Sequence, residues 1–149
     1  MLSLIKQDEQ STAQRGDLMA NSFPTIKFSY SGNLDKTRNF LRSLQQKRFL
    51  DKLDKYGRMG VEALRDATPK RTGTTANSWD YIIEDTGDSV TITWTNSNEN
   101  RSIPIALLIQ YGHGTGTGGW VAGVDYINPA LKPIFDEIAK SAWEEVTKA

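Results

Sequence analysis

Residues 79–95, WDYIIEDTGDSVTITWT, contain the clearest secondary-structure pattern in the chain. Val90, Ile92 and Trp94 alternate with threonines, which is typical of a strand with one buried face. Residues 79–85 alternate more weakly, and residues 86–89, TGDS, supply the turn of a hairpin. We therefore predict an antiparallel pair of strands over residues 79–95.

The sequence before this hairpin predicts a strand and then helical structure. Residues 25–30, TIKFSY, alternate apolar and polar positions, as expected for a half-buried strand. Helical spacing follows from Leu34 or Asp35, is interrupted at residues 45–48, and ends before Pro69. It predicts two helices or one bent helix, in which Gly57 and Gly60 admit a close-packed neighbour.

The sequence after the hairpin predicts a C-terminal helix. Residues 103–111, IPIALLIQY, are apolar on all sides. They fit either a short helix with Pro104 in its first position or a buried strand. Asn128 and Pro129 are a plausible cap and first residue for a final helix. Its apolar positions are Ala130, Leu131, Ile134, Phe135, Ile138, Ala142, Trp143 and Val146.

These elements together predict an α+β fold. A small antiparallel sheet, made by hairpin 79–95 and an N-terminal strand, packs with a long or bent N-terminal helix pair and a C-terminal helix. The 149 residues suit one domain, which we place at residues 22–149. Residues 1–21 are polar and poor in aromatics, and we predict an N-terminal arm or a disordered extension there.

Charge is balanced overall but uneven along the chain. Residues 19–74 hold twelve basic and five acidic residues, whereas residues 75–149 hold four basic and ten acidic ones. Such a separation suits head-to-tail self-association, or a basic and an acidic helix that neutralise each other within the fold. No cysteine is present, which excludes disulfides and thiolate catalysis. No secretory signal or membrane-spanning run is visible, so we expect a cytoplasmic protein with no membrane partner.

Residues 110–129, QYGHGTGTGGWVAGVDYINP, hold six of the twelve glycines and the only histidine. Gly114, Gly116 and Gly119 have the spacing of a dinucleotide-binding loop, but no helix start follows them, so no cofactor is expected. His113 has only Asp125 as a nearby acid, too few ligands for a metal site. No serine-nucleophile motif accompanies the histidine. We expect no catalytic residue and predict a protein that is not an enzyme.

This glycine-rich stretch is better suited to protein contact, because glycine frees the backbone path and aromatic residues act as anchors. The candidate interface residues are Tyr111, Gly112, His113, Gly114, Gly116, Gly118, Gly119, Trp120 and Tyr126. An alternative function is nucleic-acid binding through the basic helical region 35–70. A small hydrolase centred on His113 is a third possibility, for which the sequence names no substrate.

Three short motifs, in order, resemble a family of tailed-phage proteins. Ala67-Thr68-Pro69, Thr72-Gly73 and Ser78 resemble the pattern A-x-P-x-x-T-G-x-L-x-x-S, in which Thr75 or Ala76 replaces the usual leucine. Residues 106–112 resemble a segment Y-A-x-x-x-E-x-G, with Gln110 in place of glutamate. Residues 126–131, YINPAL, resemble a helix start F-x-x-P-A-L. The family is that of neck or tail-completion proteins, also called gene-product-10-like head–tail joining proteins.

The resemblance covers about residues 33–146 and implies a virion structural protein without catalytic activity. It implies a homo-oligomeric ring, a hexamer or a dodecamer, at the head–tail junction. The ring would contact a head-side connector or stopper and the tail tube or tail terminator, after assembly in the host cytoplasm. DNA would pass through it without sequence-specific binding. The candidate lumen-facing residues are Arg42, Lys47, Arg48 and Lys52.

Overall fold

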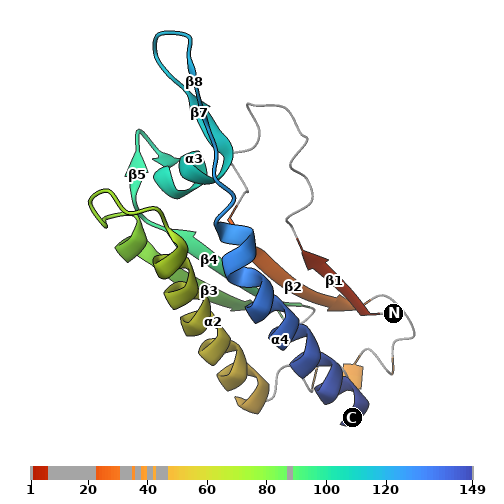
Figure 1. Ribbon diagram of the computed structural model, residues 1–149. Helices are drawn as coiled ribbons and strands as arrows, with labels where there is room; N and C mark the ends of the chain where they lie inside the picture. Colours follow the sequence, from red (N-terminus) through yellow and green to blue (C-terminus); the bar gives the residue numbers. More distant parts are fainter. Residues whose placement is uncertain are drawn as a thin grey trace.

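The computed structural model describes residues 2–6, 23–30, 35, 38–39, 42, 47–86 and 89–148. Within these residues the chain has an α+β fold, in which two long helices lie on one face of a small antiparallel sheet (Figure 1). This is the predicted fold class. The predicted helix over residues 34–44 falls largely outside the described residues.

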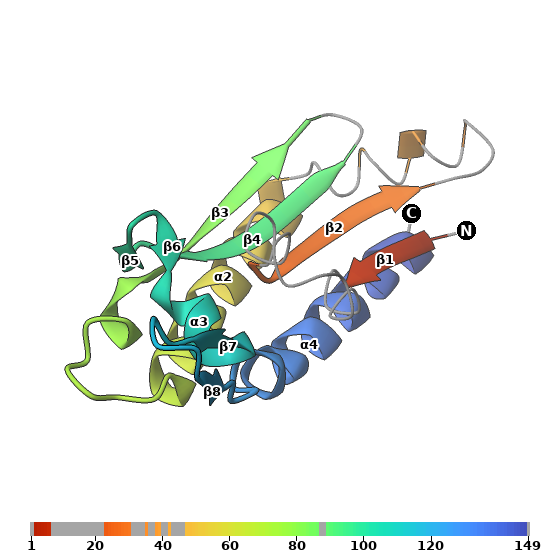
Figure 2. The same ribbon diagram turned by 90° about the horizontal axis from the view of Figure 1, so that it is seen from above.

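The sheet has the strand order β1–β2–β4–β3, and each neighbouring pair is antiparallel. β3 (Trp79–Asp85) and β4 (Val90–Asn96) are the predicted strands of hairpin 79–95, with Tyr81 opposite Trp94. β2 (Thr25–Tyr30) is the predicted N-terminal strand and lies beside β4. Along β4 buried residues alternate with half-buried ones, so the helices cover one face of the sheet only (Figure 2).

β1 (Leu2–Lys6) adds a fourth strand. It pairs with β2 from Leu2 opposite Tyr30 to Lys6 opposite Ile26. The sequence predicts an arm or a disordered extension over residues 1–21, and the disordered alternative is wrong for these five residues. A strand of this length has no stability of its own and depends on the free edge of β2, which the local sequence does not reveal.

α2 (Lys47–Ala67) is the second predicted helix, and it ends before Pro69 as expected. Its glycines bring it close to the sheet: a Cβ atom on Gly60 would lie 2.2 Å from the indole nitrogen of Trp94, and one on Gly57 would lie 2.3 Å from the ring of Tyr81. The Trp94 indole N–H donates to the Gly57 carbonyl at 2.9 Å. The prediction of close packing at both glycines is confirmed.

α4 (Ile127–Lys148) lies beside α2 and completes the helical layer (Figures 1 and 2). The core lies between this layer and the sheet. Its largest fully buried residues are Trp94, Phe49, Ile26, Leu53, Leu64, Ile92, Leu107, Leu131, Ile138 and Val90.

Shorter elements gather at one end of the two helices. A 3-10 turn, η1 (Ala76–Ser78), leads into β3, and β5 (Glu99–Asn100) pairs with β6 (Ile103–Pro104). α3 (Ile105–Tyr111) follows directly. Residues 103–111 are therefore a short strand and then a helix, and Pro104 is the residue before the first helical turn rather than within it.

Candidate protein interface

The glycine-rich stretch folds as a second hairpin that projects from this end of the molecule (Figure 1). β7 (Gly112–Gly114) and β8 (Trp120–Ala122) pair antiparallel, with His113 opposite Val121. In the turn, the Thr115 amide donates to the Gly119 carbonyl at 2.8 Å, and the Gly119 amide donates to Thr115 Oγ1 at 2.8 Å. The sequence predicts only a glycine-rich contact stretch here, and the pairing of β7 with β8 is seen in the structure alone.

Two glycines fix the base of the hairpin. Gly112 has a φ of 82°, and a Cβ atom there would lie 2.5 Å from the Val121 carbonyl oxygen. A Cβ atom on Gly123 would lie 2.4 Å from the Gln110 carbonyl oxygen. The two backbones cross too closely for any other residue. The Val124 amide donates to the Ile109 carbonyl at 2.8 Å, which joins the hairpin to α3.

Gln110 is a buried capping residue that the sequence analysis missed. Its Oε1 accepts hydrogen bonds from the Tyr126 and Ile127 amides at 3.0 and 2.9 Å, at the start of α4. Its Nε2 donates to Asp125 Oδ1 at 2.6 Å. The predicted cap, Asn128, lies inside the helix, and its Oδ1 is buried without a hydrogen-bond partner among the described residues.

Tyr126 belongs to the core rather than to an exposed interface. Only 5% of it is exposed, and its hydroxyl donates to the Ala106 carbonyl at 2.9 Å. Burial raises its pKa above the usual range, and a side-chain hydrogen bond with Thr68 opposes that rise. The prediction of Tyr126 as an exposed anchor is therefore wrong. The local sequence around an aromatic residue is the same whether the residue is buried or exposed. Only the fold distinguishes the two.

The other predicted interface residues divide by exposure. Gly114, Gly116, Gly118, Gly119 and Trp120 are exposed, Tyr111 and His113 are half-buried, and Gly112 is buried. The hairpin brings the exposed ones together at its tip. His113 Nδ1 is buried without a hydrogen-bond partner among the described residues.

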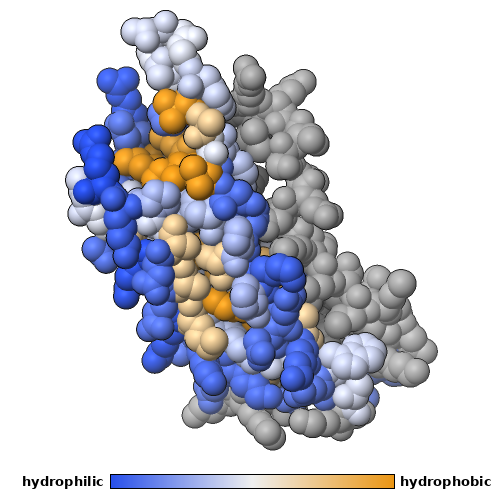
Figure 3. Space-filling view, in the orientation of Figure 1, coloured by the Kyte–Doolittle hydropathy of each residue, from blue (hydrophilic) through white to orange (hydrophobic). Residues whose placement is uncertain are grey.

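Large apolar side chains are exposed on and beside the second hairpin, and we call these residues the hairpin patch. Its exposed members are Trp120 at 55%, Val124 at 55%, Val121 at 45% and Ile103 at 38%, and half-buried residues of α3 adjoin them. The space-filling view shows the apolar area over α3 and the hairpin base (Figure 3). The sequence of residues 102–124 contains no Lys, Arg, Asp or Glu.

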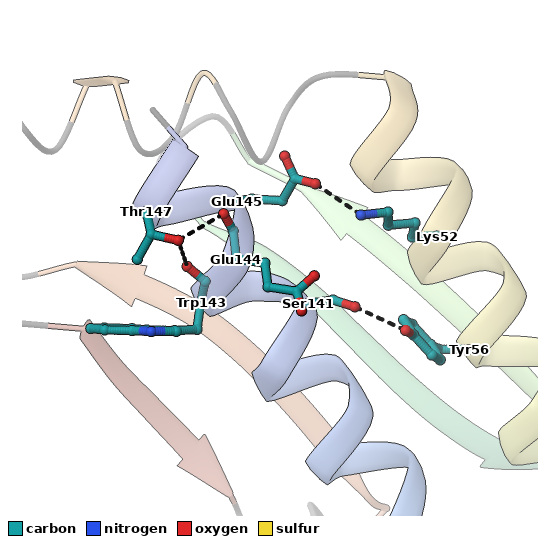
Figure 4. A network of polar contacts seen from close by, with 7 residues as sticks. All are labelled: Lys52, Tyr56, Ser141, Trp143, Glu144, Glu145 and Thr147. Atoms are coloured by element: carbon teal, nitrogen blue, oxygen red, sulfur yellow. Dashed lines mark hydrogen bonds and ion pairs between the residues drawn. The ribbon is translucent and has the colours of Figure 1, made fainter.

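Among the predicted basic residues, Lys52 is paired with an acidic residue of the same subunit. Lys52 Nζ lies 2.8 Å from Glu145 Oε1 of α4, with side chains 30% and 12% exposed. Figure 4 shows this pair beside the hydrogen bond between Tyr56 and Ser141. Lys52 is thus neutralised within the subunit, which agrees with the second interpretation of the charge separation. Arg42 is exposed, and the side chains of Lys47 and Arg48 lie outside the described part of the structure.

The first family-like motif forms the connection from α2 to β3. The Thr68 hydroxyl donates to the Leu64 carbonyl and accepts a 2.9 Å hydrogen bond from the Trp79 indole N–H. Gly73 has a φ of 81°, and its carbonyl accepts from the Asn77 amide at 3.0 Å. The Ser78 hydroxyl donates to the Thr74 carbonyl at 2.7 Å. These residues fix the path by which the chain enters the sheet.

No group of three or more His, Asp or Glu side chains in the described part of the chain is arranged to hold a metal ion. None of the described helices has the length and apolar character needed to cross a membrane.

Comparisons with protein-family models, with curated proteins and with solved structures gave no match.

Proposed function

We propose that this chain is a structural subunit of a tailed-phage virion, a neck or tail-completion protein that assembles as a homo-oligomeric ring at the head–tail junction. In this proposal the hairpin patch contacts an adjacent subunit or an adjacent ring. The exposure of the patch is the observation that carries the proposal, and the order of the three family-like motifs supports the choice of family.

The hairpin patch has the properties of a surface that is covered in an assembly. Exposed large apolar residues close together in the fold are typical of protein–protein contact sites. Trp120, at 55% exposure, is the kind of side chain that dominates binding energy when a partner buries it. Because the Gly112–Gly123 crossing and the Thr115 turn already fix the hairpin backbone, little conformational entropy remains to be lost on docking.

The absence of charged side chains from the hairpin indicates what kind of partner it would bind. With no Lys, Arg, Asp or Glu over residues 102–124, the hairpin has no cationic side chain of Lys or Arg to neutralise phosphate groups and suits an uncharged protein surface. The basic helix is also less available to nucleic acid than its sequence predicts, since Lys52 pairs with Glu145, and Arg58 pairs with Asp54 at 2.7 Å. A ring subunit therefore fits better than a nucleic-acid-binding module.

The test compares two exposed tryptophans at opposite ends of the molecule. Light scattering and native mass spectrometry of the purified chain are expected to show one closed oligomer. Trp120→Ala is expected to weaken association at least about tenfold, because a central hot spot contributes about 2 kcal/mol or more. Trp143→Ala, at 60% exposure near the end of α4, is the matched control and is expected to leave association nearly unchanged.

A monomer in light scattering, together with absence of the chain from purified virions, would contradict the proposal. Salt-dependent DNA affinity of the isolated chain would instead favour the nucleic-acid-binding alternative, since neutralising phosphates releases counterions. Charge reversal at Lys47 and Arg48 is expected to impair DNA passage or assembly if these residues face the lumen. Unchanged phage titres of this variant would contradict a lumen-facing role of the two residues.

A further inference from the structure

β1 is separable from the rest of the sheet. It is the outermost strand of the order β1–β2–β4–β3, so its removal leaves the pairing of the other three strands unchanged. Among the described elements, β2 is the only one with which β1 makes more than marginal contact. The position of β1 therefore depends on one pairing, from Leu2–Tyr30 to Lys6–Ile26, which the edge of any copy of β2 can provide.

The chain between β1 and β2 is much longer than their pairing requires. Two antiparallel strands need a connection of only about two residues, whereas residues 7–24 separate Lys6 from Thr25. These eighteen residues are long enough to span about 60 Å when extended. A compact domain of this size has a radius of gyration of about 15 Å. A connection of this length is therefore long enough to reach the same β2 edge on a neighbouring subunit.

We propose that β1 is an exchanged strand: in the assembled ring, Leu2–Lys6 of one subunit pairs with β2 of the next subunit, in the register seen within one chain. This inference rests on the proposed ring. The hydrogen bonds are the same in both arrangements, so exchange needs no new interface and adds one identical link per subunit around the ring. The N-terminal strand then links each subunit of the ring to the next one.

Crosslinking across the β1–β2 register tests this proposal, because the chain has no cysteine of its own. Ser3 lies opposite Ser29, so the double variant Ser3→Cys/Ser29→Cys is treated with a short bifunctional maleimide. Denaturing electrophoresis is expected to show a ladder of covalent multimers that ends at the ring. The control pair Thr25→Cys/Thr93→Cys joins β2 to β4 inside one chain and is expected to give monomers only.

A second arm uses the single variants Ser3→Cys and Ser29→Cys, unfolded and refolded as a mixture. Only pairing between subunits gives a crosslinked dimer that contains one chain of each kind, and this dimer is the expected product. A ring in light scattering with crosslinked product only at monomer mass overturns the exchange and leaves the ring intact. A chain that is monomeric in light scattering and crosslinks only within itself overturns both proposals.

Discussion

Tryptophan and glycine occur both in the helix-covered body and in the projecting hairpin, but their environments differ between the two regions. Trp94 of β4 is fully buried and bonded to the backbone of α2, whereas Trp120 of β8 is 55% exposed. Gly57 and Gly60 give the rings of the sheet room to approach a helix, whereas Gly112 and Gly123 let two backbone segments cross. The surrounding fold, rather than the residue type, therefore decides whether a tryptophan is buried in the core or exposed at the surface.

The two tryptophans give the largest expected difference. Trp94→Ala leaves a cavity and removes the indole hydrogen bond to the Gly57 carbonyl, and we expect it to lower the free energy of unfolding by about 3–5 kcal/mol. Trp120 is 55% exposed, so Trp120→Ala removes far less buried surface, and we expect a change within about 0.5 kcal/mol. Chemical denaturation of both variants at low protein concentration measures the difference. Equal losses would show that the hairpin is part of the core.

The glycines give the next largest effect. Gly60→Ala forces the methyl group against the Trp94 indole, and we expect overpacking to lower the free energy of unfolding by about 1–3 kcal/mol. Gly116→Ala is the matched control in the hairpin turn, where a Cβ atom has nothing within 4 Å. We expect it to be neutral within about 0.5 kcal/mol. A neutral Gly60→Ala would contradict the close approach of α2 to the sheet.

Gln110 connects the base of the hairpin to the start of α4 through hydrogen bonds, and its substitution tests how much these bonds stabilise the fold. Gln110→Ala leaves the buried Tyr126 and Ile127 amides without acceptors, which we expect to lower the free energy of unfolding by about 1–2 kcal/mol. Hydrogen exchange is expected to quicken at these two amides and in the first turn of α4. Exchange that stays slow there would mean that another group caps the helix.

The smallest expected effect is on the pH dependence of stability. Burial raises the pKa of Tyr126 in the folded chain, so between its unfolded pKa of about 10 and the folded value the unfolded state binds fewer protons. Its contribution is thus complete below pH about 10 and is lost as pH rises above that. Tyr126→Phe is expected to flatten the alkaline fall of the free energy of unfolding.

Tyr81→Phe is the comparison for this last prediction. Burial and the hydrogen bond to Asp54 also raise the pKa of Tyr81, but Tyr81 is only half-buried. We expect its loss to flatten the alkaline slope less than the loss of Tyr126 does. Parallel denaturation series from pH 8 upward measure both slopes. An unchanged slope in Tyr126→Phe would contradict a buried hydroxyl.

The body was largely predictable from local pattern. Strand β4 and helices α2 and α4 each bury one face over several turns or alternations, so their periodicity reports their environment directly. The second hairpin was not predictable in this way. Its strands are three residues long and rich in glycine, so no alternation exists, and its pairing depends on the crossing of Gly112 and Gly123.

Among the individual site residues, those that depend on distant contacts were also the ones that the sequence did not predict. Trp120 was found from composition and is exposed, but Tyr126 is buried under α3. The sequence predicted Lys52 as a lumen-facing cation. Its partner, Glu145, is 93 residues away in the chain, so no local pattern indicates the pair. Gln110 gave no signal as a cap, since capping residues are normally adjacent to the helix they cap.

The amino-acid sequence by itself determined the fold class, the main strands and helices, the position of the glycine-rich stretch and the absence of cysteine. Each of these depends on spacing or composition within a few residues. Only the tertiary structure decided that the glycine-rich stretch is a hairpin, that Tyr126 is core, that Lys52 is neutralised and that residues 2–6 join the sheet. Those outcomes depend on contacts between segments far apart in the chain, which no local pattern records.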